Sequence, residues 1–296
     1  MAIKIIKATE ASEIKNIMLI ICGASGVGKT TLGCTADKPL LLDFEKCGYR
    51  AKETCSRAEI SCKDDIDQLF NSDLSDYNTI VIDSLGYFID LILTHAQGAD
   101  RNTTFKHWGI VRTYFRNFFF KLRSLGKDLV ILAQEAKEKD NNQKISYELD
   151  GQGKTKDLVY QLADLMCRIT KIDKVVSLEF SSTESTLGKD CCNFGKQIVP
   201  NYEKCNDYLG NLITIAKEKI NTDNKLQAEK KRKEEEILAK IATADIDGLN
   251  ELLGDKFIQE SKNRYFKVEM FQRSKNLGLE YDSTTKQFEI KGDSKE

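Results

Sequence analysis

The stretch GASGVGKTT, from Gly23 to Thr31, constrains this chain more than any other feature. It fits the pattern G-x-x-x-x-G-K-T. The continuous apolar run Ile17–Cys22 precedes it, as expected for a buried parallel strand, and a helical pattern follows it. A glycine-rich turn between a strand and a helix lets successive backbone N–H groups face phosphate oxygens. The sequence therefore predicts a phosphate-binding loop within a βα unit.

Each polar group of this loop has an expected role. Lys29 would reach the β- and γ-phosphates of a nucleotide, and the Thr30 hydroxyl would face a magnesium ion. The positive end of the helix that opens near Lys29 favours the same anion. We therefore predict ATP and Mg²⁺ as ligands. The expected nucleotide-binding residues are Gly23, Ala24, Ser25, Gly26, Val27, Gly28, Lys29, Thr30 and Thr31.

Three further short apolar runs have the character of buried strands: Leu40–Asp43, Thr79–Asp83 and Leu129–Ala133. Helical patterns lie between them, and strands that alternate with helices indicate a parallel sheet covered on both faces. One of these helical patterns has apolar residues at helical spacing that predict a core-facing stripe: Phe105, Trp108, Val111, Phe115, Phe118, Leu122 and Leu125. The predicted fold class is α/β.

Polar side chains close these predicted strands. Asp83 ends one strand, which suits a magnesium ligand, although a helix N-cap is the other reading. Asp43 and Glu45 lie two residues apart and would share a face if the strand continued. Gln134 follows LVILA; it either contacts the γ-phosphate as a neutral hydrogen-bonding group or starts a loop. Ligands of open α/β sheets bind at the carboxyl ends of the strands.

The order of these motifs resembles that of RecA-like ATPases over about residues 15 to 180. The chain has GASGVGKTT, then DFE at Asp43–Glu45, then IVIDS with Asp83, then ILAQ with Gln134. The resemblance implies a RecA-like core in which Glu45 polarises the attacking water, Asp83 supports magnesium, and Gln134 couples the nucleotide to DNA. Lys29, Glu45 and Gln134 are then the catalytic residues, and Thr30 and Asp83 the metal residues.

The resemblance also implies DNA-contacting segments. Residues 94–105 correspond to the first DNA loop, and the polar stretch Glu135–Gln152 corresponds to a mobile DNA-binding loop. In size and layout the chain is most similar to small phage-type RecA-core proteins that promote single-strand annealing. We therefore expect a DNA-stimulated ATPase that acts on single-stranded DNA in recombination or annealing and self-associates with ATP near a subunit interface. The alternatives are a helicase or helicase loader in replication, and a regulatory ATPase that acts on a protein partner.

Composition divides the chain into a core at residues 1–215, a charged helical linker at 216–240 and a small C-terminal module at 241–296. The linker contains AEKKRKEEE, in which acidic and basic residues are mixed. The module, a candidate site for a protein partner, has aromatic and apolar residues that predict a helical core, with a hairpin at Leu279–Ile290. These core residues are Phe257, Tyr265, Phe266, Met270 and Phe271.

Charge and cysteine content limit the environment. With 45 basic and 46 acidic residues, any nucleic-acid contact must come from a local patch. The nine cysteines include no C-x-x-C pair, and no signal peptide is apparent, so we expect reduced thiols in a cytoplasm. No apolar run approaches the roughly 18 residues of a membrane span.

Overall fold

The computed structural model describes residues 3, 5–52, 54–100, 102–139, 145–150, 154–183, 185–201, 205–261 and 264–291; for residues 139 and 145 it describes the backbone alone. The chain forms two compact units. One is Ile14–Ile220, and the other combines Met1–Glu13 with Asn221–Glu296. Each unit has its own hydrophobic core.

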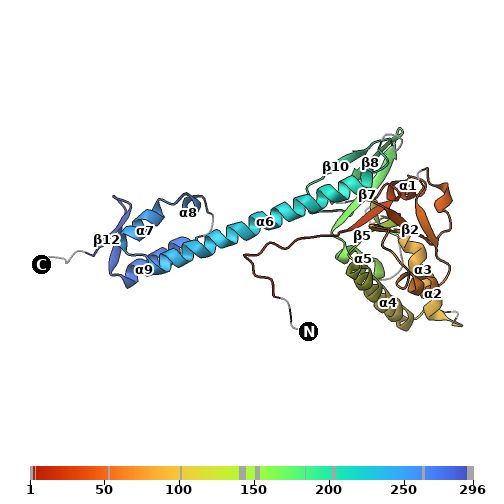
Figure 1. Ribbon diagram of the computed structural model, residues 1–296, viewed down its shortest axis with the longest axis horizontal. Helices are drawn as coiled ribbons and strands as arrows, with labels where there is room; N and C mark the ends of the chain where they lie inside the picture. The colour runs from red at the N-terminus through yellow and green to blue at the C-terminus, as the bar shows by residue number, and fades with distance from the viewer. Residues whose placement is uncertain are drawn as a thin grey trace. The chain divides into compact units, whose positions relative to one another are not determined.

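The larger unit is built on one mainly parallel sheet (Figure 1). Its main strands are β1 (Met18–Gly23), β2 (Pro39–Asp43), β3 (Ser56–Glu59), β4 (Thr79–Asp83), β5 (Asp128–Lys139), β7 (Leu165–Ile172), β8 (Val175–Glu179) and β10 (Lys196–Val199). They lie in the order β10-β8-β7-β1-β5-β4-β2-β3. The six strands β7, β1, β5, β4, β2 and β3 are parallel to their neighbours in this order. Strands β8 and β10 extend the sheet in antiparallel fashion. Strand β6 (Ile145–Leu149) pairs with β5, and β9 (Lys189–Asp190) pairs with β7.

Helices cover both faces of the sheet. The helices of this unit are α1 (Lys29–Gly33), α2 (Lys63–Leu69), α3 (Leu85–Gln97), α4 (Phe105–Ser124), α5 (Thr155–Leu162) and the start of α6 (Tyr208–Thr243). Alternate strand residues face opposite sides, so Ile20 packs with α2 to α5, whereas its neighbour Leu19 packs with α1 and α6. The predicted α/β fold with helices on both faces is confirmed.

Helix α4 forms over the predicted range, with one difference in its apolar stripe. Val111, Phe115, Phe118 and Leu122 are buried as expected. Phe105, however, is 98% exposed. It is the first residue of α4, and the first buried side chain of the helix comes two residues later. The expected core role of Phe105 is therefore wrong.

The polar stretch after Gln134 is also different from the prediction. Strand β5 does not end at Gln134 but continues to Lys139, and it pairs with β6 from Glu135↔Leu149 to Lys139↔Ile145. A mobile loop is therefore wrong for these two segments, because their backbone N–H and C=O groups pair with each other despite their polar side chains. Residues 140–144 and 151–152 of the predicted loop lie outside the described residues.

Helix α6 runs through the predicted boundaries of the charged linker, and the two compact units divide after Ile220 within this helix. Its first turns belong to the larger unit, since Leu209 and Leu212 lie in the core beneath the sheet. The Lys217 ammonium lies 2.6 Å from the Asp128 carboxylate. The boundary at residue 215 stays a prediction, but a cut there would remove this ion pair.

The smaller unit has its own core of helices and one hairpin. Its elements after α6 are α7 (Ile246–Leu253), α8 (Lys256–Glu260), α9 (Tyr265–Asn276), β11 (Leu279–Asp282) and β12 (Gln287–Ile290). Phe266 and Met270 are buried and Phe257 packs against them, as predicted, whereas Tyr265 and Phe271 are 52% and 40% exposed. Each of these two residues is next to a buried position of α9, and the Phe271 ring still contacts Phe288 of the hairpin at a centroid distance of 5.5 Å. Among the described helices, none combines the length and apolarity needed to cross a membrane.

Candidate nucleotide-binding site

Strand β1 ends at Gly23 and helix α1 begins at Lys29, so the loop between them carries the predicted phosphate-binding residues. Gly28 is the N-cap of α1 with φ 105°, a conformation that side chains strongly disfavour. Gly23 is required for a different reason: a Cβ there would lie 2.6 Å from both Cγ2 and the carbonyl oxygen of Ile169 on β7. The glycines therefore serve both the turn and the packing of β7 against the loop.

The Lys29 ammonium lies inside the curve of the loop. Nζ donates to the carbonyl oxygens of Gly23 at 2.8 Å and Ala24 at 2.9 Å. Burial lowers the pKa of Lys29, partly offset by the negative charge of Asp83. Carbonyl oxygens are weaker partners for an ammonium than phosphate oxygens are. The loop therefore holds a desolvated cation where a phosphate would be the stronger partner, which fits a nucleotide.

Thr30 and Asp83 meet across the carboxyl edge of the sheet. The Thr30 hydroxyl donates to Oδ2 of Asp83 at 2.6 Å. Burial raises the pKa of Asp83 to about 6, and the hydrogen bond from Thr30 opposes the shift. A hydroxyl and one carboxylate are oxygen donors of the kind Mg²⁺ takes from protein while it keeps several waters. These two side chains therefore fit a magnesium ion.

The alternative role of Asp83 as a helix cap does not fit the structure. The N-cap of α3 is Ser84, and even its side chain makes no capping hydrogen bond. Instead the Ser84 hydroxyl donates to Oε1 of Glu45 at 2.7 Å. The Asp83 carboxylate thus lines the pocket, and the Ser84 hydroxyl contacts Glu45 rather than the start of the helix.

Asp43 and Glu45 have separate roles, because β2 ends at Asp43. Asp43 is buried and accepts backbone N–H groups of Cys47 at 3.1 Å and Gly48 at 2.7 Å, which closes the turn after the strand. Glu45 lies beyond the strand end and lines the pocket. Glu45 lines the pocket together with Lys29, Thr30 and Asp83, whereas Asp43 lies opposite Asp83 in the β2–β4 register but does not line the pocket.

Phe44 anchors this turn to the helices. Its ring is stacked on Phe88 of α3 at a centroid distance of 4.6 Å, and Phe88 contacts Phe115 of α4 at 4.4 Å. The residue next to Glu45 is therefore held by a buried aromatic cluster. This packing limits the positions that the Glu45 backbone can take.

Gln134 lies opposite Gly23 in the β1–β5 register and lines the pocket. The next residue, Glu135, accepts two hydrogen bonds from Arg168 on β7, at 2.7 and 3.2 Å. The Arg168 guanidinium also lies 3.8 Å from the centre of the Tyr147 ring on β6. Gln134 therefore faces the pocket and directly precedes the paired part of β5 and β6, which Arg168 holds through Glu135. It is not the first residue of a loop.

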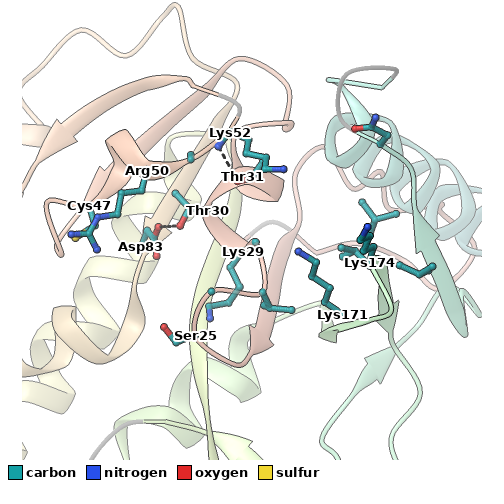
Figure 2. Close-up of a pocket in the computed structure, with 18 of the residues that line it drawn as sticks. Ser25, Lys29, Thr30, Thr31, Cys47, Arg50, Lys52, Asp83, Lys171 and Lys174 are labelled. Carbon is teal, nitrogen blue, oxygen red and sulfur yellow. Dashed lines mark hydrogen bonds between the residues drawn. The ribbon is translucent and has the colours of Figure 1, made fainter.

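These side chains surround a cavity of about 810 Å³ that has a second wall (Figure 2). Lys171 and Lys174, at the turn between β7 and β8, lie across from Lys29, and Arg50 and Lys52 lie near Thr30 and Thr31. The rest of the second wall is mostly apolar: Val175, Val176, Ile198, Val199, Pro200 and Asn201.

No motif in the sequence indicates this second wall. Asp173 and Lys174 have φ of 47° and 70°, typical of a two-residue hairpin turn. The available signal was an Asp-Lys pair between the apolar stretches of β7 and β8. That signal predicts a hairpin, but it does not place the hairpin beside the phosphate-binding loop.

The comparison with protein families agrees with this geometry. A family model described as AAA domain matches residues 15–192, which is more than half of the chain. The matched range includes the pocket residues named above, except those of β10 and the segment after it. The comparison with curated proteins found no match. Given the mainly parallel sheet, the phosphate-binding loop and this match, the chain belongs to the AAA domain family of P-loop NTPases.

Proposed function

We propose that this protein binds and hydrolyses ATP with Mg²⁺ and couples that reaction to single-stranded DNA in recombination or strand annealing. The observation that carries the ATPase proposal is one pocket lined by Lys29, Thr30, Glu45 and Asp83, in which the Thr30 hydroxyl donates to Asp83 and the buried Ser84 hydroxyl, outside the lining, donates to Glu45. A binding site alone would not need Glu45. A carboxylate beside the phosphate site is the group that a hydrolytic reaction requires.

The roles follow from the contacts. Lys29 would exchange the carbonyl oxygens of the loop for phosphate oxygens. Thr30 and Asp83 would hold Mg²⁺, which would supply positive charge to stabilise the phosphates. Glu45 accepts a proton from the attacking water, with its carboxylate oriented by the Ser84 hydroxyl. Lys171 and Lys174 offer positive charge from the opposite wall.

The DNA part of the proposal is supported by two features. Gln134 faces the pocket and continues into the paired strands β5 and β6, so a change at the γ-phosphate has a short covalent route to that segment. Phe105, at the end of the predicted first DNA loop, is 98% exposed and is followed by Lys106, which is also exposed. An exposed aromatic ring beside a cation suits a stacked base and its phosphate.

The test is the rate of ATP hydrolysis with and without single-stranded DNA at two salt concentrations. We expect stimulation by DNA that weakens as salt rises, because the contacts must come from a local patch of a nearly neutral chain. Phe105→Ala should reduce the stimulation and leave the DNA-free rate unchanged. A rate that DNA does not alter would favour a regulatory ATPase with a protein partner. ATP-driven strand separation on a forked substrate would favour the helicase alternative.

Coupling through Gln134 is tested by DNA titrations with and without a non-hydrolysable ATP analogue. We expect tighter DNA binding with the analogue, and Gln134→Ala should remove this difference while ATP affinity stays largely intact. Gln227→Ala, an exposed glutamine on α6 outside the pocket, is the matched control. Equal DNA affinity in both nucleotide states of the unaltered protein would contradict the coupling, because a ligand without preference between two states cannot shift them.

A further inference from the structure

Two cysteines that are far apart in the sequence meet beside the phosphate-binding loop. The Sγ atoms of Cys34 and Cys55 lie 2.7 Å apart. Cys34 is the C-cap of α1, the helix that opens at Lys29, and Cys55 directly precedes β3. Both side chains are half-buried, so small molecules can reach them while the surrounding structure holds them in place.

The segment that Cys55 ends is part of the pocket. Residues 44–52 leave the end of β2 and bring Glu45, Arg50 and Lys52 to the pocket lining before β3 begins. Its start is held by Asp43, which accepts two backbone N–H groups. Its later part touches α1 through the Lys52 N–H, which donates to Oγ1 of Thr31 at 3.2 Å. A covalent bond between Cys34 and Cys55 would join the end of this segment to α1.

We propose that Cys34 and Cys55 form a reversible disulfide that fastens residues 44–55, and with them one rim of the nucleotide pocket, to the phosphate-loop helix. The chemical partner is a low-molecular-weight disulfide such as oxidised glutathione. The proposal concerns the pocket described above, and it deepens the proposed function by giving that pocket an oxidative modification site.

The reaction balances as two thiol–disulfide exchanges. The Cys55 thiolate attacks one sulfur of the small disulfide, which forms a mixed disulfide and releases one small thiolate. Cys34 then loses its proton to solvent or to the released thiolate, and its sulfur attacks Sγ of Cys55, which expels the second small thiol. Two protein thiols are oxidised, and one small disulfide is reduced to two thiols.

Electrostatics favour Cys55 as the first nucleophile. The hydrogen bond from Cys34 lowers the pKa of Cys55, since it stabilises the thiolate. The other close pair in the described residues is different. Cys191 and Cys192 are adjacent in the sequence with Sγ atoms 3.8 Å apart, and burial raises the pKa of Cys192 to about 12. Burial also raises the pKa of Cys191, so both thiols of that pair ionise less readily than an ordinary cysteine.

The experiment uses the full chain in glutathione buffers of increasing oxidised fraction, followed by tryptic digestion without reduction and mass spectrometry. Trypsin cleaves after Lys29, Lys46, Lys52 and Arg57, so Cys34 and Cys55 fall in separate peptides with one cysteine each. We expect these two peptides to appear joined, with a mass lower by two hydrogens than their sum, and to separate again with dithiothreitol. Joined peptides that involve other cysteines, with Cys34 and Cys55 still alkylated as free thiols, would overturn the proposal.

Amide hydrogen exchange tests the restraint itself. Oxidation should slow exchange of residues 44–54, and reduction should restore it. Cys34→Ser and Cys55→Ser should each abolish both effects, whereas Cys62→Ser, an exposed cysteine at the start of α2, should retain them. Two separate variants keep the test valid if one of them folds poorly. Unchanged exchange in protein shown to carry the Cys34–Cys55 bond would also contradict the proposal.

These readouts do not depend on catalysis. Reduced protein that binds no ATP or hydrolyses none would contradict the proposed function and leave the disulfide proposal standing. Conversely, normal ATP hydrolysis in protein that never forms the Cys34–Cys55 bond would contradict only the disulfide.

Discussion

The two walls of the nucleotide pocket are built in different ways. On the first wall, which consists of the phosphate-binding loop and the ends of β2 and β4, three polar side chains already have partners within the wall. Lys29 contacts loop carbonyls, Thr30 contacts Asp83, and Ser84 contacts Glu45. On the second wall, Lys171 and Lys174 are exposed at a hairpin turn, with exposed Val175 and Ile198 beside them.

The difference shows how each wall obtains its function. The first wall is preorganised, because burial and fixed hydrogen bonds hold its groups where charge must be stabilised. The cations of the second wall are long, solvated side chains, whose charges are screened and whose ordering costs entropy. We therefore expect substitutions on the first wall to affect the chemical step and substitutions on the second wall to affect mainly binding.

The largest expected effect is that of Lys29→Ala. It removes the only cation of the phosphate-binding loop, so ATP hydrolysis should fall by about 10² to 10³-fold, with weaker nucleotide binding. Steady-state ATPase assays and a nucleotide titration measure both quantities. Lys225→Ala, which removes an exposed charge outside the pocket, is the control. Turnover at the level of the unaltered protein would exclude the loop as the phosphate site.

Glu45→Gln should separate binding from chemistry. The substitution keeps the shape and the hydrogen bond from Ser84 but removes the proton acceptor, so turnover should fall by about 10²-fold while ATP still binds. Isothermal titration with ATP and a single-turnover assay give the two values. Unchanged hydrolysis would make Glu45 a surface carboxylate, and the resemblance to RecA-like ATPases would lose its main catalytic residue.

Asp83→Asn tests how much the burial of the Asp83 charge lowers the free energy of unfolding in the nucleotide-free protein. Burial raises the pKa of folded Asp83 to about 6 from 3.8, so the folded state binds more protons than the unfolded state between these values. The free energy of unfolding should therefore fall as pH rises through this window. Asp83→Asn should raise it at pH 7, by up to about 3 kcal/mol.

Chemical denaturation at pH 4, 5, 6 and 7 measures this effect in metal-free buffer. The Asn variant should show a flatter dependence on pH over the window and should lose the stabilisation that Mg²⁺ and ATP give together. A variant that is less stable than the unaltered protein at pH 7 would mean that the Asp83 charge is stabilised by its surroundings rather than penalised by burial.

Ser84→Ala has a smaller expected effect. The hydroxyl caps no helix end, and its described contact is with Glu45, so the loss of one charge-assisted hydrogen bond should lower turnover by roughly fivefold to tenfold with little change in KM. Ser84→Thr, which keeps a hydroxyl, should restore most of the rate. A change in KM alone would place Ser84 in binding rather than in the positioning of Glu45.

The smallest effect is expected on the second wall. Replacement of both Lys171 and Lys174 by Ala should weaken ATP binding by roughly threefold to tenfold, with kcat nearly unchanged, and added salt should shrink the difference. Lys196→Ala, an exposed lysine on β10 that does not line the pocket, is the matched control. A large loss of kcat would show that the second wall also stabilises the transition state.

Local motifs in the sequence determined the phosphate-binding loop, the strands around it and the α/β class. The geometry of the loop between Gly23 and Thr31 depends on residues that are adjacent in the sequence. The apolar runs at β1, β2 and β4 identify buried strands by their own composition. Asp83 and Glu45 were also identified in this way, because a charged residue at the end of a buried run is a local signal.

Only the tertiary structure decided how distant segments combine. Glu135 is polar and follows a buried strand, so its sequence suggests a loop, yet its bidentate pairing with Arg168 on β7 keeps it in an extended strand. Lys171 reaches the pocket because β7 pairs with β1, and Cys34 meets Cys55 because β2 and its following turn return the chain to α1. Such contacts depend on strand order and packing, which no short stretch of sequence specifies.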